Sequence, residues 1–331
     1  MPVDFRSDTV TKPSDQMRSA IANANVGDDV YREDLSIKHL EEKAADLLGH
    51  EAGLFVSSGT QSNLCALLTH CARGDEYIAG QTAHTYRFEA GGAASLGGIQ
   101  PQPIPFREDG TLDLNEIVNV IKPNDFHYAK TKLLCLENTN QGQAIPISYF
   151  AKIRKLTKEH NLFLHLDGAR LFNAAIANNV EAQEYAKHCD SVSICLSKGL
   201  GAPVGSVLAG KKNFIEKARR WRKMLGGGMR QAGFLAAAGL YALDNNIERL
   251  ELDHLRARNL AVGLSEILGK DAVSYATNMI FIDYKNIADL GVKLRSKNIL
   301  ISGNRLVVHL DINDNDIEHA LTAFSTSVVT S

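Results

Sequence analysis

The sequence lacks the features that mark secreted, membrane-spanning or nucleic-acid-binding proteins. Its five cysteines form an odd set without a CxxC pair, which favours free buried thiols in a reducing compartment over disulfides or a zinc site. Its longest nearly apolar run, 233–243, is far shorter than the roughly 18 residues that a membrane span needs. The formal net charge of −2 gives no excess of either sign that would favour nucleic acid or an anionic membrane. Because the polar N-terminus also shows no apolar signal segment, we expect a cytoplasmic protein without nucleic-acid or membrane partners.

What the sequence does contain is a regular alternation of strand-like and helical segments. The 331 residues are 44% hydrophobic and 22% charged, which is an ordinary globular composition. Short apolar runs typical of buried strands occupy 53–56, 132–136, 162–166, 191–196 and 205–209. Helical patterns occupy 36–49, where a glycine ends the pattern, a stretch from 61 onward, 148–160, 182–187 and 212–224. This order predicts an α/β fold with a mostly parallel sheet between helices.

The rhythm changes in the last third of the chain. From 229 to about 268 the pattern is purely helical, and two strand-like runs, 279–283 and 305–310, are then each followed by a helical stretch. We therefore predict a large domain over 21–245 and a small C-terminal α+β domain over 246–331. The first 20 residues match neither pattern and are expected to pack across the domain boundary.

Lys198 is the first candidate for chemistry. It follows a buried strand-like run and precedes a glycine, which predicts a position at the sheet edge where open α/β proteins bind ligands. A lysine with the ordinary pKa of about 10.4 needs about 4.6 kcal/mol to lose its proton at pH 7 and attack a carbonyl. Neighbouring cations, burial or storage as a preformed imine would remove that barrier. The alternative is a solvated lysine at a strand end.

Asp167 is the second candidate, at the end of the run that begins at 162. Period-two alternation puts Phe163, His165 and Asp167 on one face of this strand and the three leucines on the other. A carboxylate at the crevice edge can hold a pyridine nitrogen protonated through a charge-assisted hydrogen bond. Two alternatives stay open: Asp167 caps a turn and pairs with Arg170, or His160, His165 and Asp167 bind a metal. Since no further ligand has convincing spacing, we predict no metal site.

The third candidate is the segment 57–61, between a predicted strand and a predicted helix. Backbone N–H groups at a helix N-terminus, approached closely because of Gly59, suit a phosphate. Ordinary N-capping by Ser58 or Thr60 is the alternative, and a nucleotide would leave the lysine and the aspartate without a role. A lysine nucleophile, a carboxylate for a ring nitrogen and a phosphate cup together indicate pyridoxal 5'-phosphate.

A series of longer segments then identifies a family. In chain order these segments are 6–11 (RSDTVT), 26–31 (VGDDVY), 58–64 (SGTQSNL), 84–92, 136–139 (LENT), 165–170 (HLDGAR), 195–205 (CLSKGLGAPVG) and 226–231 (GGGMRQ). Through them the chain closely resembles the L-threonine aldolase family, fold-type-I pyridoxal-phosphate lyases, and among these its low-specificity bacterial members. Two residues depart from the family pattern. Arg32 stands where a glycine usually follows the tyrosine, and Asn140 replaces a frequent histidine.

The resemblance implies how the cofactor is bound. Lys198 would carry pyridoxal phosphate as a Schiff base, with Asp167 at the pyridine nitrogen and Arg170 at the phenolic oxygen. Gly59 and Thr60 would hold the phosphate, and His84 would stack on the ring.

The resemblance also implies how the substrate is bound and how subunits cooperate. Ser7 and Arg305 would bind the carboxylate of the amino acid, and His127 would lie near its hydroxyl. Tyr31, at the substrate, and Arg230, at the cofactor, would be contributed across a subunit interface, since the family shares its active sites in a homotetramer.

The implied reaction is retro-aldol cleavage of a β-hydroxy-α-amino acid, threonine or allo-threonine, to glycine and acetaldehyde. The catalytic base stays open among His84, His127 and an ordered water. Two other classes also stay open. One is a pyridoxal-phosphate lyase that releases ammonia and a keto acid by β-elimination. The other is a non-catalytic binding relative, against which the intact Lys198, Asp167 and Arg170 argue.

Overall fold

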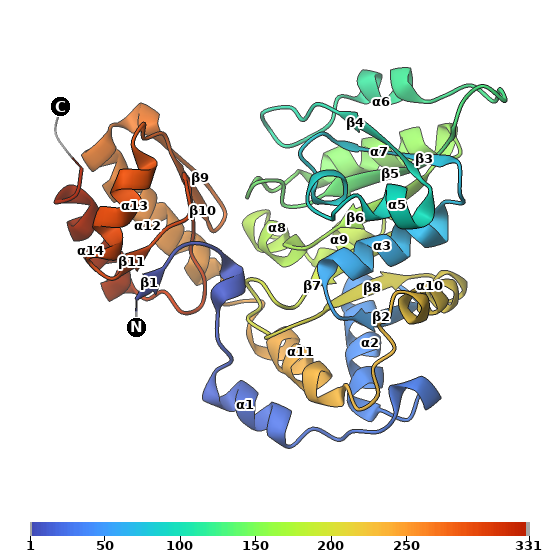
Figure 1. Ribbon diagram of the computed structural model, residues 1–331, viewed down its shortest axis with the longest axis horizontal. Coiled ribbons are helices and arrows are strands. Elements are labelled where there is room, and N and C mark those ends of the chain that lie inside the picture. The colour runs from blue at the N-terminus through green and yellow to red at the C-terminus, as the bar shows by residue number, and fades with distance from the viewer. Residues whose placement is uncertain (1, 329–331) are drawn as a thin grey trace.

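The computed structural model describes residues 2–328, and its centre is a seven-stranded sheet (Figure 1). The strand order is β2-β8-β7-β6-β5-β3-β4, and β8 runs antiparallel to both of its neighbours while the other pairings are parallel. The predicted mostly parallel sheet is therefore confirmed. The strand bounds are β2 Ala52–Val56, β3 Asp75–Gly80, β4 Gln100–Ile104, β5 Lys130–Glu137, β6 Phe163–Asp167, β7 Ser191–Cys195 and β8 Ser206–Gly210.

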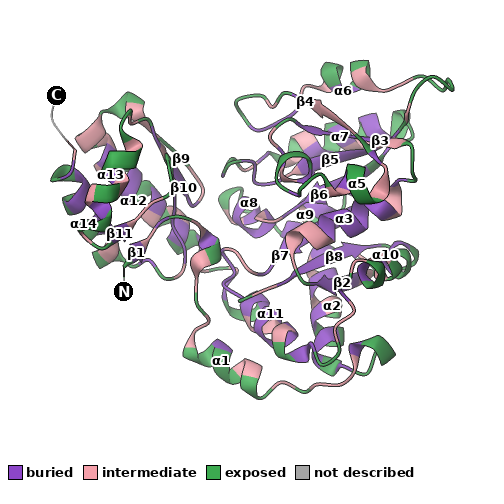
Figure 2. Ribbon diagram, viewed as in Figure 1, coloured by how far each residue is buried: buried purple, intermediate pink, exposed green. Residues whose placement is uncertain are grey.

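Helices cover both faces of this sheet, and the buried residues lie between the layers (Figure 2). One face carries α3 (Gly59–His70), α5 (Gly92–Gly97) and α10 (Lys212–Met224). The other carries α2 (Leu35–Leu48), α7 (Ile147–Glu159) and α9 (Ala182–Ala186), with α11 (Gly233–Asn245) packed on α2 and α1 (Asp15–Ala22) on α11. Shorter helices are α4 (His84–Arg87), α6 (Leu114–Val120) and α8 (Leu171–Ala177).

The strand β6 shows how the sequence pattern sets the two faces. Leu164 and Leu166 pack in the apolar cluster under α2 and α7. His165 and Asp167 point to the opposite face, where both meet a side chain of α3. The predicted alternation along this strand is confirmed, and it delivers a histidine and a carboxylate to the α3 side of the sheet.

Local signals fix where α2 begins and ends. The Asp34 carboxylate accepts a hydrogen bond from the Ile37 N–H at 3.0 Å and caps the N-terminus. Gly49 ends the helix at a φ of 64°, a left-handed conformation that glycine adopts without strain. The helix predicted over 36–49, with a glycine as its stop, is thus confirmed within a residue.

A second, smaller sheet follows the long helix α12 (Leu250–Leu268), at the left of Figure 1. In a separate two-stranded sheet, the N-terminal strand β1 (Val3–Asp4) pairs with β11 (Ile299–Leu300), and Val3 and Phe5 lie in the apolar cluster of this C-terminal part. The chain then crosses to the large sheet through a 3-10 turn, η1 (Asp8–Val10). Among residues 2–328, no helix combines the length and the apolar character needed to cross a membrane. The remaining elements are β9 Val273–Ala276, β10 Met279–Ile282, α13 Ile287–Arg295, β11 Ile299–Leu300, β12 Arg305–Val307 and α14 Asp314–Ser325.

Candidate active site

The three candidates named from sequence meet at one edge of the large sheet. Asp167 is the last residue of β6 and pairs in register with Ser193 of β7, and Lys198 follows three residues after the end of β7. The helix α3 starts at Gly59, shortly after β2, which is parallel to β7. A Cβ on Gly59 would stand 2.8 Å from the Cys195 sulfur, so a residue without a side chain is needed for this helix N-terminus to lie against the end of β7.

The start of α3 is built to receive an anion. The Ser58 hydroxyl accepts a hydrogen bond from the Gln61 N–H at 3.2 Å, so the N-capping alternative is confirmed for Ser58. The cap uses only one of the first-turn donors. The N–H groups of Gly59 and Thr60 have no acceptor within the helix, and they remain for a phosphate.

Asp167 is buried and held from two sides. Asn63 Nδ2 donates to its Oδ2 at 2.8 Å, and the Ala169 N–H donates to its Oδ1 at 3.0 Å. Asp167 therefore does cap a turn, as one alternative proposed. A carboxylate offers about four acceptor positions, so two remain for a ligand. The other part of that alternative, a pair between Asp167 and Arg170, is wrong.

Arg170 instead pairs with Asp8 of the N-terminal crossing segment. Its Nε and Nη2 donate to the two carboxylate oxygens at 2.7 and 2.6 Å, and the Asp8 side chain is fully buried. Burial alone would raise the pKa of Asp8, but the charges of Arg170 and Lys198 outweigh it and lower that pKa. In the described part of the chain, no hydrogen bond uses Arg170 Nη1, which leaves this nitrogen for a ligand oxygen.

Arg305 and Ser7 lie near this ion pair. Arg305 begins β12, and burial together with the nearby positive charge of Arg170 lowers its pKa, while Asp8 acts in the opposite direction. No side chain among residues 2–328 accepts a hydrogen bond from the Arg305 guanidinium. The Ser7 hydroxyl accepts hydrogen bonds from the backbone N–H and the hydroxyl of Thr9, and it directly precedes Asp8. An arginine without a partner beside a buried ion pair is suited to binding a substrate carboxylate.

His84 brings a titratable ring to the same edge. Its Nδ1 lies 2.8 Å from Glu89 Oε1, and this hydrogen bond raises the pKa of the imidazole. Its backbone N–H donates to Glu137 Oε2 at 2.8 Å, and Glu137 ends β5 beside Asp167. Burial, followed by the Asp167 charge, raises the pKa of Glu137 to about 7. Two titratable groups with a raised pKa, His84 and Glu137, therefore lie at this edge of the sheet.

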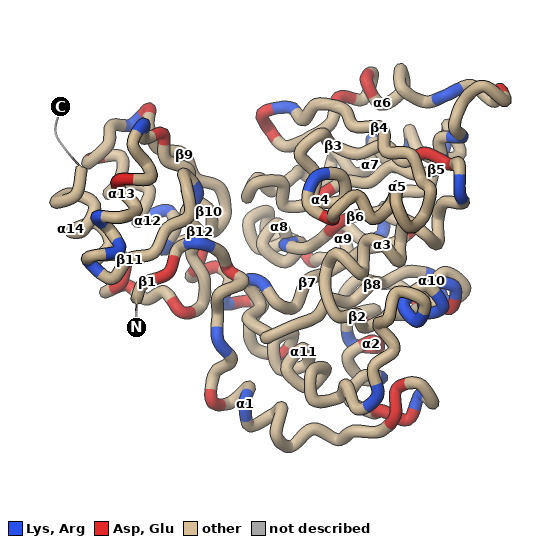
Figure 3. Tube along the Cα trace, in the orientation of Figure 1, with Lys and Arg blue, Asp and Glu red and all other residues tan. Residues whose placement is uncertain are grey.

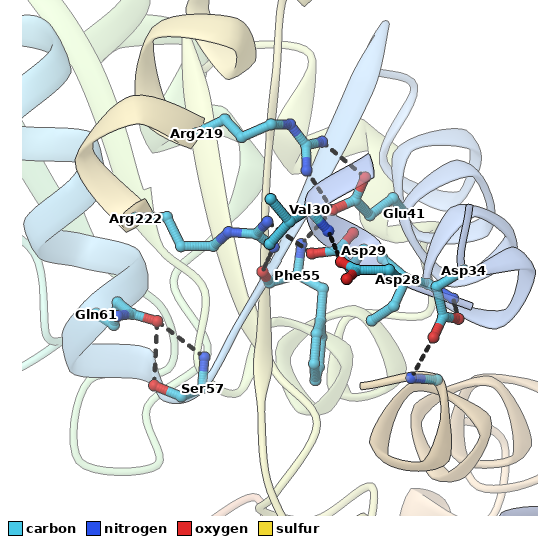
Figure 4. A network of polar contacts seen from close by, with 12 residues as sticks. Asp28, Asp29, Val30, Asp34, Glu41, Phe55, Ser57, Gln61, Arg219 and Arg222 are labelled. Carbon is cyan, nitrogen blue, oxygen red and sulfur yellow. Dashed lines mark hydrogen bonds and ion pairs between the residues drawn. The ribbon is translucent and has the colours of Figure 1, made fainter. Parts of the chain in front are cut away.

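The loop that carries Tyr31 is fixed to α10 by a buried ion pair, and the same arginine is hydrogen-bonded to β2 (Figure 4). Arg222 Nη2 binds Asp29 Oδ2 at 2.7 Å, and Arg222 Nη1 donates to the Phe55 carbonyl at 2.8 Å. One turn earlier in α10, Arg219 binds Glu41, whose Oε1 accepts the Phe55 N–H at 2.9 Å. Both backbone groups of Phe55 are thus tied to the network, just before the phosphate cup.

Tyr31 and Arg230 lie together on the surface. Arg230 Nη1 binds Asp28 at 2.9 Å, its carbonyl accepts the Asp29 N–H, and Tyr31 is 72% exposed. Among the described residues, no hydrogen bond or ion pair joins either of them to Lys198. Arg32 adopts a φ of 61°, a left-handed conformation that glycine would adopt with less strain.

His127 is not brought to this edge within one chain. It lies before the amino end of β5, whereas Glu137 and Asp167 lie at the carboxyl ends of β5 and β6. Eight strand residues at about 3.3 Å each separate the two ends by roughly 25 Å. His127 is 68% exposed and forms a hydrogen bond with Asp125 at 2.7 Å. Its contact with the substrate hydroxyl remains a prediction that one chain alone cannot fulfil.

Four residues of the site were absent from the sequence-based candidates: Asp8, Asn63, Glu89 and Glu137. Each one acts on a predicted residue from a distant part of the chain, except Glu89, which is five residues from His84. Their only signal was a place inside the family segments. The metal alternative also fails at His165, because Ser191 and Asn63 occupy its two ring nitrogens.

The donors and acceptors at this edge fit pyridoxal phosphate. The first-turn N–H groups of α3 suit its phosphate, the open acceptor positions of Asp167 suit its ring nitrogen, and Arg170 Nη1 suits its phenolic oxygen. Lys198 carries an amine that suits its aldehyde.

Comparisons with known proteins agree with this chemistry. The model of the family described as beta-eliminating lyase matches residues 4–287. The chain is 53% identical over 316 residues to the low specificity L-threonine aldolase of Escherichia coli (strain K12), covering 94% of this chain and 95% of that protein. It is 46% identical over 340 residues to the probable low-specificity L-threonine aldolase 2 of Arabidopsis thaliana, covering 97% and 96%. In fold, it is similar to the Leishmania major threonine aldolase, with a TM-score of 0.83 at 22% identity and coverage of 98% and 99%.

Proposed function

This chain belongs to the beta-eliminating lyase family, and we propose that it is a pyridoxal-phosphate-dependent aldehyde-lyase of the low-specificity L-threonine aldolase type. It cleaves the Cα–Cβ bond of threonine and allo-threonine to give glycine and acetaldehyde. The observation that carries the proposal is the meeting of a lysine, a buried carboxylate and a helix N-terminus at one sheet edge. The relatives that are 53% and 46% identical over nearly the whole chain bear names of this activity.

Pyridoxal phosphate supplies the electron sink for this reaction when it is bound. Lys198 would hold its aldehyde carbon, and the Asp167 carboxylate would accept a hydrogen bond from its protonated ring nitrogen. The start of α3 binds the phosphate through the N–H groups of Gly59 and Thr60. His84 would pack against the ring, and its hydrogen bond with Glu89 fixes the orientation of the imidazole.

Substrate recognition falls to the small domain and the N-terminal segment. The Arg305 guanidinium binds the carboxylate of the amino acid, and the fork geometry fixes the orientation of the substrate as well as its affinity. Ser7 adds a hydroxyl beside it, and the Asp8–Arg170 pair ties that segment to the cofactor site. Orientation matters here because the bond that breaks depends on how the substrate is held.

Proton transfer is assigned to His84. Of the two histidines considered as base, His84 lies at this edge within one chain and His127 does not. Because Glu89 binds Nδ1, the ring turns Nε2 outward, and the raised pKa makes it a stronger base. Glu137, with a pKa of about 7, can store the proton next to it.

The complete site requires a second copy of the chain. Tyr31, Arg230 and His127 are all exposed and lie apart from Lys198, so a neighbouring subunit must present them if they act on cofactor and substrate. We therefore propose a homotetramer with shared active sites, working in the cytoplasm. We also propose that 21–245 and 246–331 act as two domains bridged by residues 1–20, which is supported by the separate apolar cluster that contains Val3 and Phe5.

The family description favours one competing activity, β-elimination to a keto acid and ammonia. Incubation of the purified protein with threonine, allo-threonine, phenylserine and serine separates the two. Glycine and an aldehyde in equal amounts support the aldolase, whereas ammonia and a keto acid support elimination. Lys198→Ala should abolish both turnover and the yellow colour of the dialysed protein. A Lys198→Ala protein that still links to the cofactor after borohydride reduction would place the attachment on another lysine.

A further inference from the structure

A chain of buried hydrogen bonds leads away from Asp167 beneath α3. Asn63 Nδ2 donates to Asp167 Oδ2 and to Glu89 Oε1, both at 2.8 Å. The carbonyl oxygen of the same amide lies 3.1 Å from His165 Nε2. Asn63 and His165 are 1% and 0% exposed, so no bulk water competes for these bonds. One amide thus joins two carboxylates on one side and a histidine on the other.

The chain continues across the sheet. His165 Nδ1 lies 2.8 Å from the Ser191 hydroxyl, and these residues are register partners on β6 and β7. His70 Nε2 lies 2.8 Å from the same hydroxyl. His70 follows Asn63 by seven residues, which is two turns, so both face the sheet from one side of α3. We call His70, Ser191, His165 and Asn63 the donor chain.

The groups at the two ends of the donor chain determine which atom donates in each of its hydrogen bonds. Carboxylate oxygens accept hydrogen bonds, so the Asn63 amide turns its NH₂ group to them and its oxygen to His165. His165 Nε2 must then carry a proton. Burial lowers the pKa of His165 to about 4, so the ring is neutral and Nδ1 accepts from the Ser191 hydroxyl. That hydroxyl in turn accepts from His70 Nε2, and burial lowers the pKa of His70 to about 3.

All donors therefore point the same way, from His70 toward Asp167. Aligned hydrogen bonds polarise one another in a low-dielectric interior, and their combined dipole favours negative charge at the accepting end. Asn63 also separates Asp167 from Glu89. Without an N–H donor between them, two facing carboxylates would favour protonation of one.

We propose that the donor chain is a positioning device that holds the Asp167 carboxylate aimed at the ring nitrogen of bound pyridoxal phosphate. None of its members touches the cofactor, so each acts through Asp167. This inference rests on the proposed function, since it assumes that Asp167 is the partner of the ring nitrogen. It gives a task to four polar residues, three of them buried and His70 partly buried, that the reaction itself does not use.

The test compares two forms of the cofactor on matched serine variants. Ser191→Ala removes the middle of the donor chain, whereas Ser193→Ala removes a buried hydroxyl without a hydrogen-bond partner from the same strand. Affinity is measured for pyridoxal phosphate and for its 1-deaza analogue, in which a C–H replaces the ring nitrogen. Ser191→Ala should weaken pyridoxal phosphate binding about three- to tenfold, the range of one hydrogen bond. Its affinity for the analogue should stay within twofold of wild type, and Ser193→Ala should bind both forms normally.

The analogue separates positioning from a merely structural role. If the variants merely damaged the structure, they would bind both cofactors more weakly to the same degree. If the donor chain had no effect on Asp167, the variants would bind both cofactors normally. Either outcome overturns the proposal. Asn63→Asp, which keeps the shape but removes both donors, should show the same selectivity with a loss of at least tenfold. It should lower kcat much more than it changes KM for threonine. If wild type itself bound both cofactors equally, Asp167 would not contact the ring nitrogen, and the proposed function rather than the donor chain would fail.

Discussion

Replacing Arg222 by methionine should destabilise the protein by about 3–5 kcal/mol, because the change leaves a buried carboxylate without its partner. The Arg222 and Asp29 side chains are 4% and 6% exposed, so water cannot replace the lost interaction. The variant also loses the hydrogen bond to the Phe55 carbonyl. With an unfolding entropy of about 2.1 cal/mol/K per residue, the whole chain would lose roughly 4–7 °C in Tm. Because Phe55 precedes the phosphate cup, pyridoxal phosphate affinity should fall as well.

Thermal unfolding followed by circular dichroism measures the effect, and α10 supplies the control. Figure 3 shows Lys and Arg gathered along this helix, so the loss of one positive charge by itself changes little. Glu216 lies on the same helix and forms an exposed ion pair with Arg32, which lies outside it. Glu216→Gln breaks this pair and should lower the free energy of unfolding by at most about 1 kcal/mol. Adding Asp29→Asn to Arg222→Met removes the orphaned charge and should restore part of the stability. A double variant no more stable than Arg222→Met, or a single variant that loses less than about 1 kcal/mol, would refute the reasoning.

Three further outcomes are expected. Arg305→Lys should lower kcat/KM for threonine by about thirtyfold, roughly 2 kcal/mol, because one ammonium cannot reproduce the two parallel hydrogen bonds of a guanidinium. Cofactor binding should not weaken. Near-normal kcat/KM in both Arg305→Lys and Arg305→Ala would show that another residue binds the substrate carboxylate. Mixing inactive Lys198→Ala with inactive Arg230→Ala subunits should restore some activity in hybrids, whereas exchange without recovery would contradict shared sites. The folded-state pKa of Glu137, about 7, lies above its ordinary value of 4.5, so the folded apoprotein binds this proton more tightly than the unfolded chain. This contribution to the free energy of unfolding, up to about 3 kcal/mol, is complete below pH 4.5 and is lost as the pH rises to 7. The free energy of unfolding, measured with denaturant and plotted against pH, should therefore have a different slope in wild type and in Glu137→Gln across that window. Equal slopes would disprove the shift in pKa.

Segments with a strong local period were predictable from the sequence, and the failures have physical causes. The helix predicted over 212–224 matches α10 in both bounds, because one apolar face and a glycine-rich stretch after it define the segment. The strand β4 was missed since it contains two prolines, which strands tolerate only at a sheet edge, and β4 does lie at the end of the sheet. The antiparallel direction of β8 was also missed. Direction depends on how the chain returns to the sheet, and residue types within a strand do not encode it.

The residues of the candidate site also fall into those that the sequence predicts and those that it does not. Lys198, Asp167 and Gly59 could be predicted because each stands at a strand end or a helix start, and the order of strands brings such ends together. The residues that hold these groups in place could not be predicted, because Asn63 contacts Asp167 across 104 residues of sequence and Asp8 contacts Arg170 across 162. Asn63 in particular looks like an ordinary helix residue until the register of β6 and β7 places His165 and Ser191 beneath it. A motif therefore identifies which groups line the candidate site, whereas their orientation depends on buried neighbours that only the folded chain brings into contact.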